Sequence, residues 1–230
     1  MVSNPGTSLP ASAADGLGPS LDGPARRRVG ELVEAARWLG GRGFLPATSG
    51  NLSVRLDDGR LALTASGRDK AALTEADLLL LDPAGRPLPA GPGTGAPSAE
   101  AALHLRLYRR FPACRAVLHV HSPASTALSR RAAAAGRAVV ELAGYELLKA
   151  LAGVTTHEHV EPVPLVENSQ DLDRLGAAAD RALDAYPSAH AYLIASHGLY
   201  TWGASVAEAR RQVEALELLF DCELLLQGPR

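Results

Sequence analysis

The run Ala116-Val117-Leu118-His119-Val120-His121 constrains the fold most, because it places two histidines in an otherwise apolar segment. We interpret this run as a buried strand. Successive side chains of a strand point to opposite faces, so His119 and His121 would share one face, about 7 Å apart. His197, in Ser196-His197-Gly198, could join them. Three imidazoles can bind one divalent ion and leave a coordination position open, which is typical of catalytic metal sites. The alternative is that the two strand histidines serve packing or lie on the surface.

Composition excludes several classes of protein. The chain has 230 residues, 47% of them hydrophobic and 21% charged, which is enough for one sizeable domain or two small ones. A net charge of −2 gives no support for nucleic-acid or membrane partners. No run approaches the roughly 18 apolar residues of a membrane span. Cys114 and Cys222 cannot form a disulfide framework, so we expect a cytoplasmic protein.

Turn residues and apolar periodicity divide the chain into alternating helices and strands. Residues 1–23 are rich in Pro, Gly, Ser and Ala and are expected to form a disordered tail, and residues 24–230 to form one catalytic domain. Helices are predicted at about 24–40, 98–111, 123–131, 141–151, 171–186 and 206–226. Strands are predicted at 51–55, 60–64, 78–82, 160–166 and 191–195, besides the histidine run. This mixture indicates an α/β or α+β fold.

Three short polar loops are candidates for binding a phosphate. They are Thr48-Ser49-Gly50-Asn51, the loop 65–70 with Ser66 and Gly67, and Pro97-Ser98-Ala99-Glu100. Their backbone N–H groups, hydroxyls and amide could surround an anion without a large basic patch. Ser98 is also expected to be the N-cap of the helix that follows. The alternative is that each loop is only a turn with a cap.

Two glutamates, Glu100 and Glu146, are candidates for acid–base chemistry. Both lie on predicted helices, where a carboxylate can equally be solvated and have no catalytic role. Glu146 stands in the largely apolar stretch Ala143-Gly144-Tyr145-Glu146-Leu147-Leu148. There we expect partial desolvation, which raises the pKa of a carboxyl group toward the range useful for proton transfer.

The remaining histidines are weaker candidates. His157-Glu158-His159 is a second His-x-His, but no apolar run precedes it, so it is not predicted to be the ligand pair. His104 is expected to pack or to lie on the surface, and His190 to lie in a loop with no partner. Tyr200 and Trp202 are expected to pack the turn after His197, although Tyr200 could also reach a ligand.

Taken together, these motifs resemble the class II aldolase/adducin family from about residue 24 to residue 226. The motifs that carry the resemblance are Ser49-Gly50-Asn51-Leu52-Ser53, Thr64-Ala65-Ser66-Gly67, Pro97-Ser98-Ala99-Glu100, His119-Val120-His121-Ser122 and His197-Gly198. Further segments are similar to the branch of that family that dehydrates a sugar phosphate. They are Pro46-Ala47-Thr48, Gly144-Tyr145-Glu146-Leu147-Leu148-Lys149, Thr156-His157-Glu158, Asn168-Ser169-Gln170-Asp171 and Leu199-Tyr200-Thr201-Trp202-Gly203.

The resemblance implies a fold and an assembly. The fold would be a three-layer α/β/α sandwich around a largely antiparallel sheet, and the chain would form a homotetramer with sites near the subunit interfaces. One divalent metal ion per subunit, usually zinc, would be bound by His119, His121 and His197. Glu146 matches the catalytic acid/base of the dehydratases, and Glu100 matches the catalytic glutamate of the related aldolases.

The resemblance also implies a substrate, a small-molecule sugar phosphate. Asn51, Ser66, Gly67 and Ser98 match positions that bind phosphate in the aldolases, and Ser49 and Glu100 are expected beside them. The expected reaction is metal-dependent dehydration of a methylthio-substituted ketose 1-phosphate to a 2,3-diketone, a step of methionine salvage. The alternatives are a sugar-phosphate aldolase, a ribulose-phosphate 4-epimerase, or a non-catalytic, adducin-like binding domain.

Overall fold

The computed structural model describes residues 21–88 and 95–228. Most of the predicted tail, residues 1–20, lies outside them. Leu21 is buried, and the Asp22 carboxylate accepts a hydrogen bond from the Ala25 N–H at the start of the first helix. These two residues therefore belong to the fold rather than to the predicted tail.

One eight-stranded sheet runs through the molecule in the order β3-β2-β1-β4-β8-β7-β6-β5. Its neighbouring strands pair antiparallel, except that β6 and β7 are parallel. The strands are β1 (Asn51–Arg55), β2 (Leu61–Thr64), β3 (Leu78–Leu81), β4 (Ala116–Val120), β5 (Val139–Ala143), β6 (Val160–Val166), β7 (Ala191–Ile194) and β8 (Gly198–Gly203).

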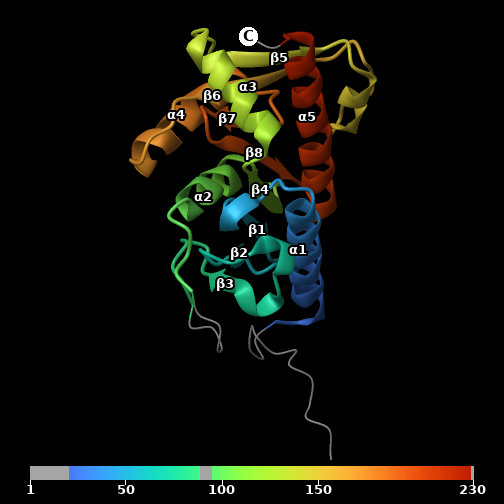
Figure 1. Cartoon of the computed structure of the whole chain (residues 1–230). Helices are drawn as coiled ribbons and strands as arrows, with labels where there is room; N and C mark the ends of the chain where they lie inside the picture. The colour runs from blue at the N-terminus through green and yellow to red at the C-terminus, as the bar shows by residue number, and fades with distance from the viewer. Residues whose placement is uncertain (1–20, 89–94, 229–230) are drawn as a thin grey trace, which may run out of the picture.

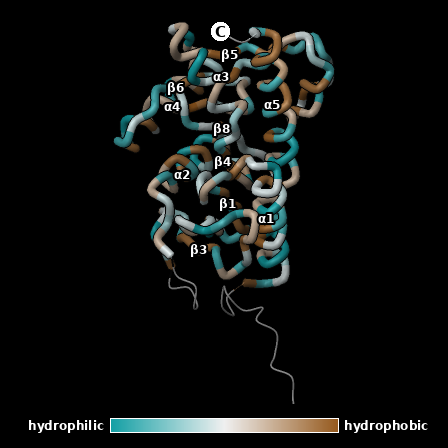
Figure 2. The backbone as a smooth tube through the Cα atoms, viewed as in Figure 1, coloured by the Kyte–Doolittle hydropathy of each residue, from teal (hydrophilic) through white to brown (hydrophobic). Residues whose placement is uncertain are grey.

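Helices cover both faces of this sheet (Figure 1). α1 (Gly23–Gly41), α3 (Pro123–Ala134) and α5 (Val206–Leu226) pack on one face, and α2 (Ala101–Arg110) and α4 (Leu172–Ala185) on the other. Each face has its own hydrophobic core. In Figure 2 hydrophobic and hydrophilic stretches alternate along α1 and α5, as expected of helices that bury one side. The prediction of three layers around a largely antiparallel sheet is confirmed.

Among the described residues, no helix combines the length and apolar character that a membrane crossing requires. The helices α1, α3, α4 and α5 begin where a side chain can satisfy their first N–H groups, whereas α2 has no side-chain cap. Asp22, Ser122, Asp171 and Ser205 accept these hydrogen bonds for α1, α3, α4 and α5. The central strands β4, β7 and β8 are buried at every position because both faces of the sheet are covered. This explains why they are continuous apolar runs rather than alternating ones.

The predicted helix at 141–151 is wrong. Residues 139–143 form β5, in which Val140 and Leu142 are buried while Glu141 and Ala143 are exposed. This is the alternation of an edge strand, and the strand pairs with β6. Gly144 then turns the chain with a φ of 78°, and only the short 3₁₀ helix η4 (Glu146–Ala150) follows.

Two further expectations are corrected. Ser98 is not a helix cap, because α2 begins at Ala101 and the Ser98 hydroxyl accepts from the Glu100 N–H instead. Tyr200 and Trp202 do not pack a turn: they lie on β8, whose register with β4 places Tyr200 opposite His119. Three more short 3₁₀ helices complete the fold: η1 (Pro46–Thr48), η2 (Lys70–Ala72) and η3 (Glu75–Asp77).

The start of β8 tolerates no side chain. A Cβ built on Gly198 would lie 2.1 Å from the Val120 carbonyl oxygen of β4. We expect Gly198→Ala to lower the free energy of unfolding by about 1–3 kcal/mol, since the two central strands must separate. Urea unfolding measures the effect. Gly30→Ala in α1 is the matched control, because no atom lies within 4 Å of the added Cβ; it should be neutral or stabilising by about 0.5–1 kcal/mol. Equal stabilities for the two variants would contradict the close approach.

Candidate metal and phosphate site

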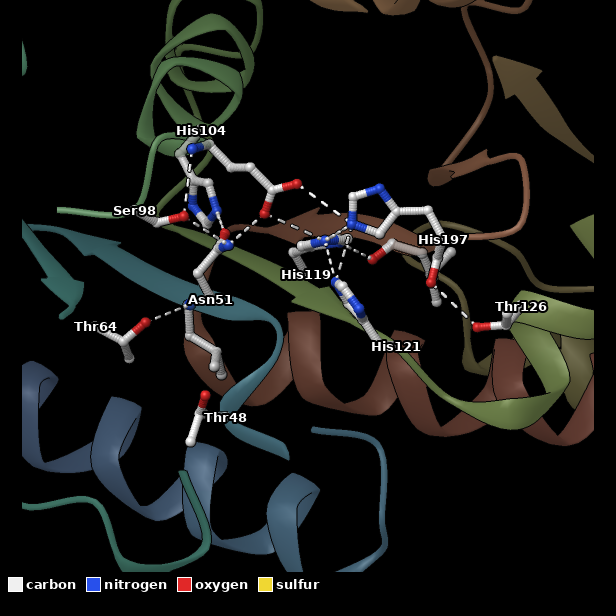
Figure 3. Close-up of polar contacts among 12 residues, drawn as sticks. Thr48, Asn51, Thr64, Ser98, His104, His119, His121, Thr126 and His197 are labelled. Carbon is white, nitrogen blue, oxygen red and sulfur yellow. Dashed lines mark hydrogen bonds and ion pairs between the residues drawn. The ribbon is translucent and has the colours of Figure 1, made fainter. Parts of the chain in front are cut away.

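Three histidines meet where β4 ends beside the turn between β7 and β8 (Figure 3). His119 is on β4, His121 directly follows it, and His197 lies in the turn. The Nε2 atom of His119 is 2.8 Å from that of His121 and 3.3 Å from that of His197, and the Nε2 atoms of His121 and His197 are 3.1 Å apart. The structure thus brings together the three residues predicted to bind metal.

The ring of His119 is held on both of its sides. Its Nδ1–H donates to the Leu199 carbonyl oxygen of β8 at 3.0 Å, which leaves the Nε2 lone pair directed at the other histidines. Its face stacks on Tyr200, with ring centroids 3.9 Å apart, and Tyr200 stacks on Tyr192 at 5.0 Å. Tyr200 is therefore a buried support for His119 rather than a ligand-contacting side chain.

The backbone around the other two histidines is also tightly held. His121 donates its N–H to the Phe44 carbonyl at 2.8 Å. The His197 carbonyl accepts from the Thr126 hydroxyl at 3.1 Å, and the preceding Ser196 has a φ of 55°, which is unusual for a residue other than glycine. Such strained conformations occur where a surrounding structure demands them, often at functional sites.

The three nitrogens fit a divalent cation. Burial lowers the pKa of His119, His121 and His197, that of His121 to about 4, so the rings are neutral at neutral pH. Neutral imidazole nitrogens are the form that binds metal, and three lone pairs directed at one another repel unless a cation lies between them. A ring whose other nitrogen donates to a backbone carbonyl, as in His119, is typical of a metal-ligating histidine.

Glu100 completes this group. Its carboxylate oxygens lie 3.5 Å from the Nε2 of His119 and 3.4 Å from that of His197. The Asn51 amide donates to the carboxylate at 2.6 Å and to the Ser98 hydroxyl at 3.3 Å. Glu100 is therefore a fourth potential ligand, or a proton-transfer group beside an ion held by the three histidines.

His104 fixes the orientation of Asn51 from inside the protein. Burial lowers the pKa of His104 to about 3, so the ring is neutral and carries one proton. Its Nε2–H donates to the Asn51 side-chain oxygen, and its Nδ1 accepts from the Ser53 hydroxyl. The expected packing role of His104 thus includes orienting an amide that contacts Glu100.

A cavity of about 200 Å³ opens beside the histidines. The three predicted phosphate loops all contribute to its lining, which consists of Thr48, Ser49, Gly50, Asn51, Thr64, Ala65, Ser66, Gly67, Lys70, Ser98, Glu100 and His121. Gly50 has a φ of 68°, and a Cβ there would lie 2.6 Å from the His119 carbonyl oxygen. A glycine therefore allows the first loop to pack directly against β4.

Lys70 is a member of this cavity that the sequence reasoning did not assign. Its side chain is only 2% exposed, and its ammonium group donates to the Thr48 carbonyl. Burial lowers its pKa, although the charge of the neighbouring Asp69 opposes this, and among the described residues Lys70 forms no salt bridge. The Ser49 hydroxyl in the same cavity is buried without a partner. An unpaired cation and a free hydroxyl are what an anion requires.

The environment of Glu146 differs from the prediction. Its side chain is 72% exposed and contacts Lys149 and, at 3.9 Å, the His157 Nδ1. The hydrogen bond from Lys149 lowers the pKa of Glu146, so the expected raised pKa is wrong for the single chain. In the described structure Glu146 makes no contact with the three histidines. The predicted desolvation of Glu146 was based on its apolar neighbours in the sequence. It fails because these neighbours turn inward while Glu146 points outward.

A second histidine group contains residues from two segments, the start of β6 and the residue before β7. His159, Glu161 and His190 lie together, with His159 Nε2 and His190 Nδ1 each 2.8 Å from a Glu161 oxygen. The expectation that His190 has no partner is therefore wrong. His157 is not part of this group, so His157 and His159 do not form a ligand pair.

Known proteins are similar to this chain in sequence. Residues 30–224 match the family described as "Class II Aldolase and Adducin N-terminal domain". The methylthioribulose-1-phosphate dehydratase of Methylococcus capsulatus is 53% identical over 201 residues, which cover 87% of this chain and 95% of that protein. The enzyme of the same name from Xanthomonas campestris is 49% identical over 229 residues and covers 96% of this chain and 97% of its own.

Solved structures share the fold. YgbL of Escherichia coli aligns with a TM-score of 0.68 at 30% identity, over 88% of this chain and 90% of its own. An L-fuculose 1-phosphate aldolase aligns with a TM-score of 0.71 at 23% identity, over 92% and 89% of the two chains, a likeness of fold alone. With a family match over most of its length and relatives at about half identity, the chain belongs to the class II aldolase and adducin family.

Proposed function

We propose that this chain is a cytoplasmic, zinc-dependent hydro-lyase that dehydrates 5-methylthioribulose 1-phosphate to 2,3-diketo-5-methylthiopentyl 1-phosphate in methionine salvage. One observation carries the proposal: the Nε2 atoms of three histidines converge beside one carboxylate and a cavity suited to an anion. The relatives that are about half identical to it carry the name of this activity.

The cavity would hold the phosphate of the substrate. Lys70 supplies the positive charge, while Ser49, Ser66 and Ser98 supply hydroxyls, and Gly67 allows close approach of the backbone. A phosphate bound there is close to His121, which lines the same cavity. The C2 carbonyl, two atoms from the phosphate oxygen, would then lie toward the three histidines.

Dehydration requires removal of a proton from C3 and protonation of the hydroxyl that leaves C4. A divalent ion on His119, His121 and His197 would polarise the C2 carbonyl and so acidify the C3 proton. Glu100, held by Asn51, lies where it can contact the substrate beside these ligands. We assign the acid/base role to Glu146, whose carboxylate would take the C3 proton and whose acid form would then return it to the hydroxyl that leaves C4.

This assignment requires a second subunit. Glu146 lies on the surface of its own chain, away from the three histidines. We therefore propose a homotetramer in which Glu146 of one subunit reaches the site of its neighbour. In the single chain Lys149 favours the ionised form of Glu146. Acting as an acid would require Glu146 to give up that contact when it packs against the neighbour.

A sugar-phosphate aldolase or ribulose-phosphate 4-epimerase is the second candidate, and one observation favours it. Glu100 adjoins the histidines, whereas Glu146 does not. In an aldolase, a single carboxylate beside the metal suffices for proton transfer. The proposed dehydration also needs Glu146. A non-catalytic, adducin-like domain is disfavoured, because three converging histidines are a costly arrangement without a ligand.

The first prediction from this proposed function concerns the metal. We expect one zinc ion per chain in the purified protein, loss of turnover on chelation, and loss of both metal and activity in His119→Ala and His121→Ala. Elemental analysis and a diketone assay measure these effects. His157→Ala and His159→Ala are the controls and should keep full metal content. A chelated enzyme that stays active, or metal lost from His159→Ala but kept in His119→Ala, would contradict the site.

The second prediction separates the two glutamates. Glu146→Gln keeps the size of the side chain but cannot exchange a proton, so turnover should fall by roughly 10²–10⁴-fold with metal content and KM nearly unchanged. Glu100→Gln should instead weaken metal or substrate binding, with a smaller effect on turnover. Steady-state kinetics with elemental analysis distinguish them. A nearly normal Glu146→Gln beside an inactive, metal-replete Glu100→Gln would favour the aldolase.

Mixed assemblies test whether Glu146 acts across an interface. Glu146→Gln and His119→Ala subunits, each inactive alone, would be co-expressed with different tags and purified as mixed oligomers. If sites are shared, a neighbour with intact Glu146 complements a subunit with intact His119, and activity returns. Mixed oligomers without activity would show that Glu146 serves its own chain or none.

The third prediction concerns Lys70. Lys70→Gln should raise KM for the phosphorylated substrate by roughly 10–100-fold, the effect of losing one charged hydrogen bond. Inhibition by inorganic phosphate should weaken in parallel. Arg68→Gln, in the same loop but outside the cavity lining, is the matched control and should behave like the wild type. Unchanged phosphate inhibition in Lys70→Gln would remove the lysine from the phosphate site.

A further inference from the structure

A buried carboxylate lies at the base of the segment that carries Glu146. Glu161 is the second residue of β6, and its side chain is fully buried. Its pairing partner on β5 is Leu142, and the next pair, Ala143 with Val160, closes the connection of residues 144–159. Figure 1 shows this connection beside α5, on the outer side of that helix. Glu161 therefore lies where the connection joins the sheet.

Among the described residues, the hydrogen bonds of the Glu161 carboxylate are all with two histidines. One carboxylate oxygen accepts from the His190 backbone N–H at 2.8 Å. The other faces His190 Nδ1 and His159 Nε2, each at 2.8 Å. The opposite nitrogen of the His190 ring, Nε2, is 2.8 Å from the Ala152 carbonyl oxygen, two residues after η4. The ring thus links the buried carboxylate to the Glu146 segment.

These contacts determine the protonation of His190. A carbonyl oxygen and an ionised carboxylate can only accept, so beside an ionised Glu161 the His190 ring donates from both nitrogens and carries a positive charge. Burial opposes that charge, but the hydrogen bond and the charge of Glu161, with the Ala152 carbonyl, outweigh it and raise the pKa of His190.

The ring nitrogens of His159 and His190 face a Glu161 oxygen, whereas the nitrogens of the three clustered histidines face one another. Hydrogen bonds therefore suffice here without a metal ion.

The network closes on itself around Ala152. The Ala152 N–H donates to the Gln212 side chain at 3.0 Å. The Gln212 amide donates to the Thr201 hydroxyl at 3.3 Å, and that hydroxyl donates to the His190 carbonyl at 2.8 Å. Gln212 and Thr201 are both buried. Both backbone groups of Ala152 are thereby fixed to the central sheet and to α5.

We infer that Glu161 and His190 form a buried charge pair that positions the Glu146 segment for the reaction. They are positioning residues, since neither lies at the metal cluster. The inference rests on the proposed role of Glu146. It follows from geometry, because the pair holds Ala152 after η4 while the β5–β6 ladder holds both ends of the connection.

The test is a double-mutant cycle between Glu161→Gln and Glu146→Gln. Glu161→Gln should lower kcat by roughly 10–100-fold, with zinc content and KM kept, since small displacements of a catalytic group have effects of this size. In the Glu146→Gln background it should cause no further loss, because the displaced group is already absent. Glu167→Gln, an exposed glutamate directly after β6, is the matched control and should have normal kcat.

Two further measurements keep the inference testable if Glu161→Gln is poorly folded. Gln212→Met releases the Ala152 N–H without touching the charge pair, and should lower kcat in the same Glu146-dependent way. Hydrogen exchange at residues 146–152 should become faster in either variant. Nitrogen NMR of the wild-type ring should show His190 protonated on both nitrogens at neutral pH.

Several outcomes would overturn the inference. These are equal losses from Glu161→Gln with and without Glu146, unchanged hydrogen exchange at residues 146–152, or a singly protonated His190. Two zinc ions per wild-type chain, one of them lost in Glu161→Gln, would show a second metal site instead. A fully active Glu146→Gln is a different result: it would overturn the proposed function of Glu146, while hydrogen exchange would still decide whether the pair holds the segment.

Discussion

The pairing of β4 with β8 is the interaction on which the site depends. Its register sets His119 opposite Tyr200 and Val120 opposite Leu199. The same pairing gives His119 the stacking surface of Tyr200 and the carbonyl of Leu199, which selects the tautomer of its ring. It also carries the turn at His197 to the end of β4. Both strands are buried on both faces, so a shift of one residue would reverse every side chain, and the register is strongly specified.

The two histidine groups show how neighbours decide what the same residue types do. In the first, three neutral rings direct lone pairs at one another, an arrangement that a cation stabilises. In the second, two rings donate to one buried carboxylate, which hydrogen bonds alone can satisfy. Spacing in the sequence does not separate these cases. His-x-His occurs in both segments, but in the second the two histidines do not act as a pair, because His159 joins Glu161 and His190 while His157 lies outside that group.

Much of the fold and of the binding site could be predicted from the sequence, where local pattern carries the information. Apolar periodicity located α1, α4 and α5, and the turn residues separated β1 from β2. The three histidines that converge and the three loops that line the cavity could be picked out because their motifs are short and local. The predictions that failed concern residues whose structure depends on partners distant in the sequence. Residues 139–143 form a strand because β6 pairs with them, and Lys70 is a cavity residue only because η2 packs beside α1.

Glu146 marks the limit of what a single chain can explain. The three histidines, Glu100 and the cavity proposed to hold the phosphate are assembled within one chain, so the proposed binding needs no partner. Glu146 is an exposed carboxylate, yet its segment is fixed by a buried charge pair and a closed ring of hydrogen bonds. A solvated surface glutamate gains nothing from such rigidity, and holding it costs conformational entropy. This rigidity is useful if Glu146 must contact a partner surface of fixed geometry. A second copy of this chain, whose cavity is open, offers such a surface.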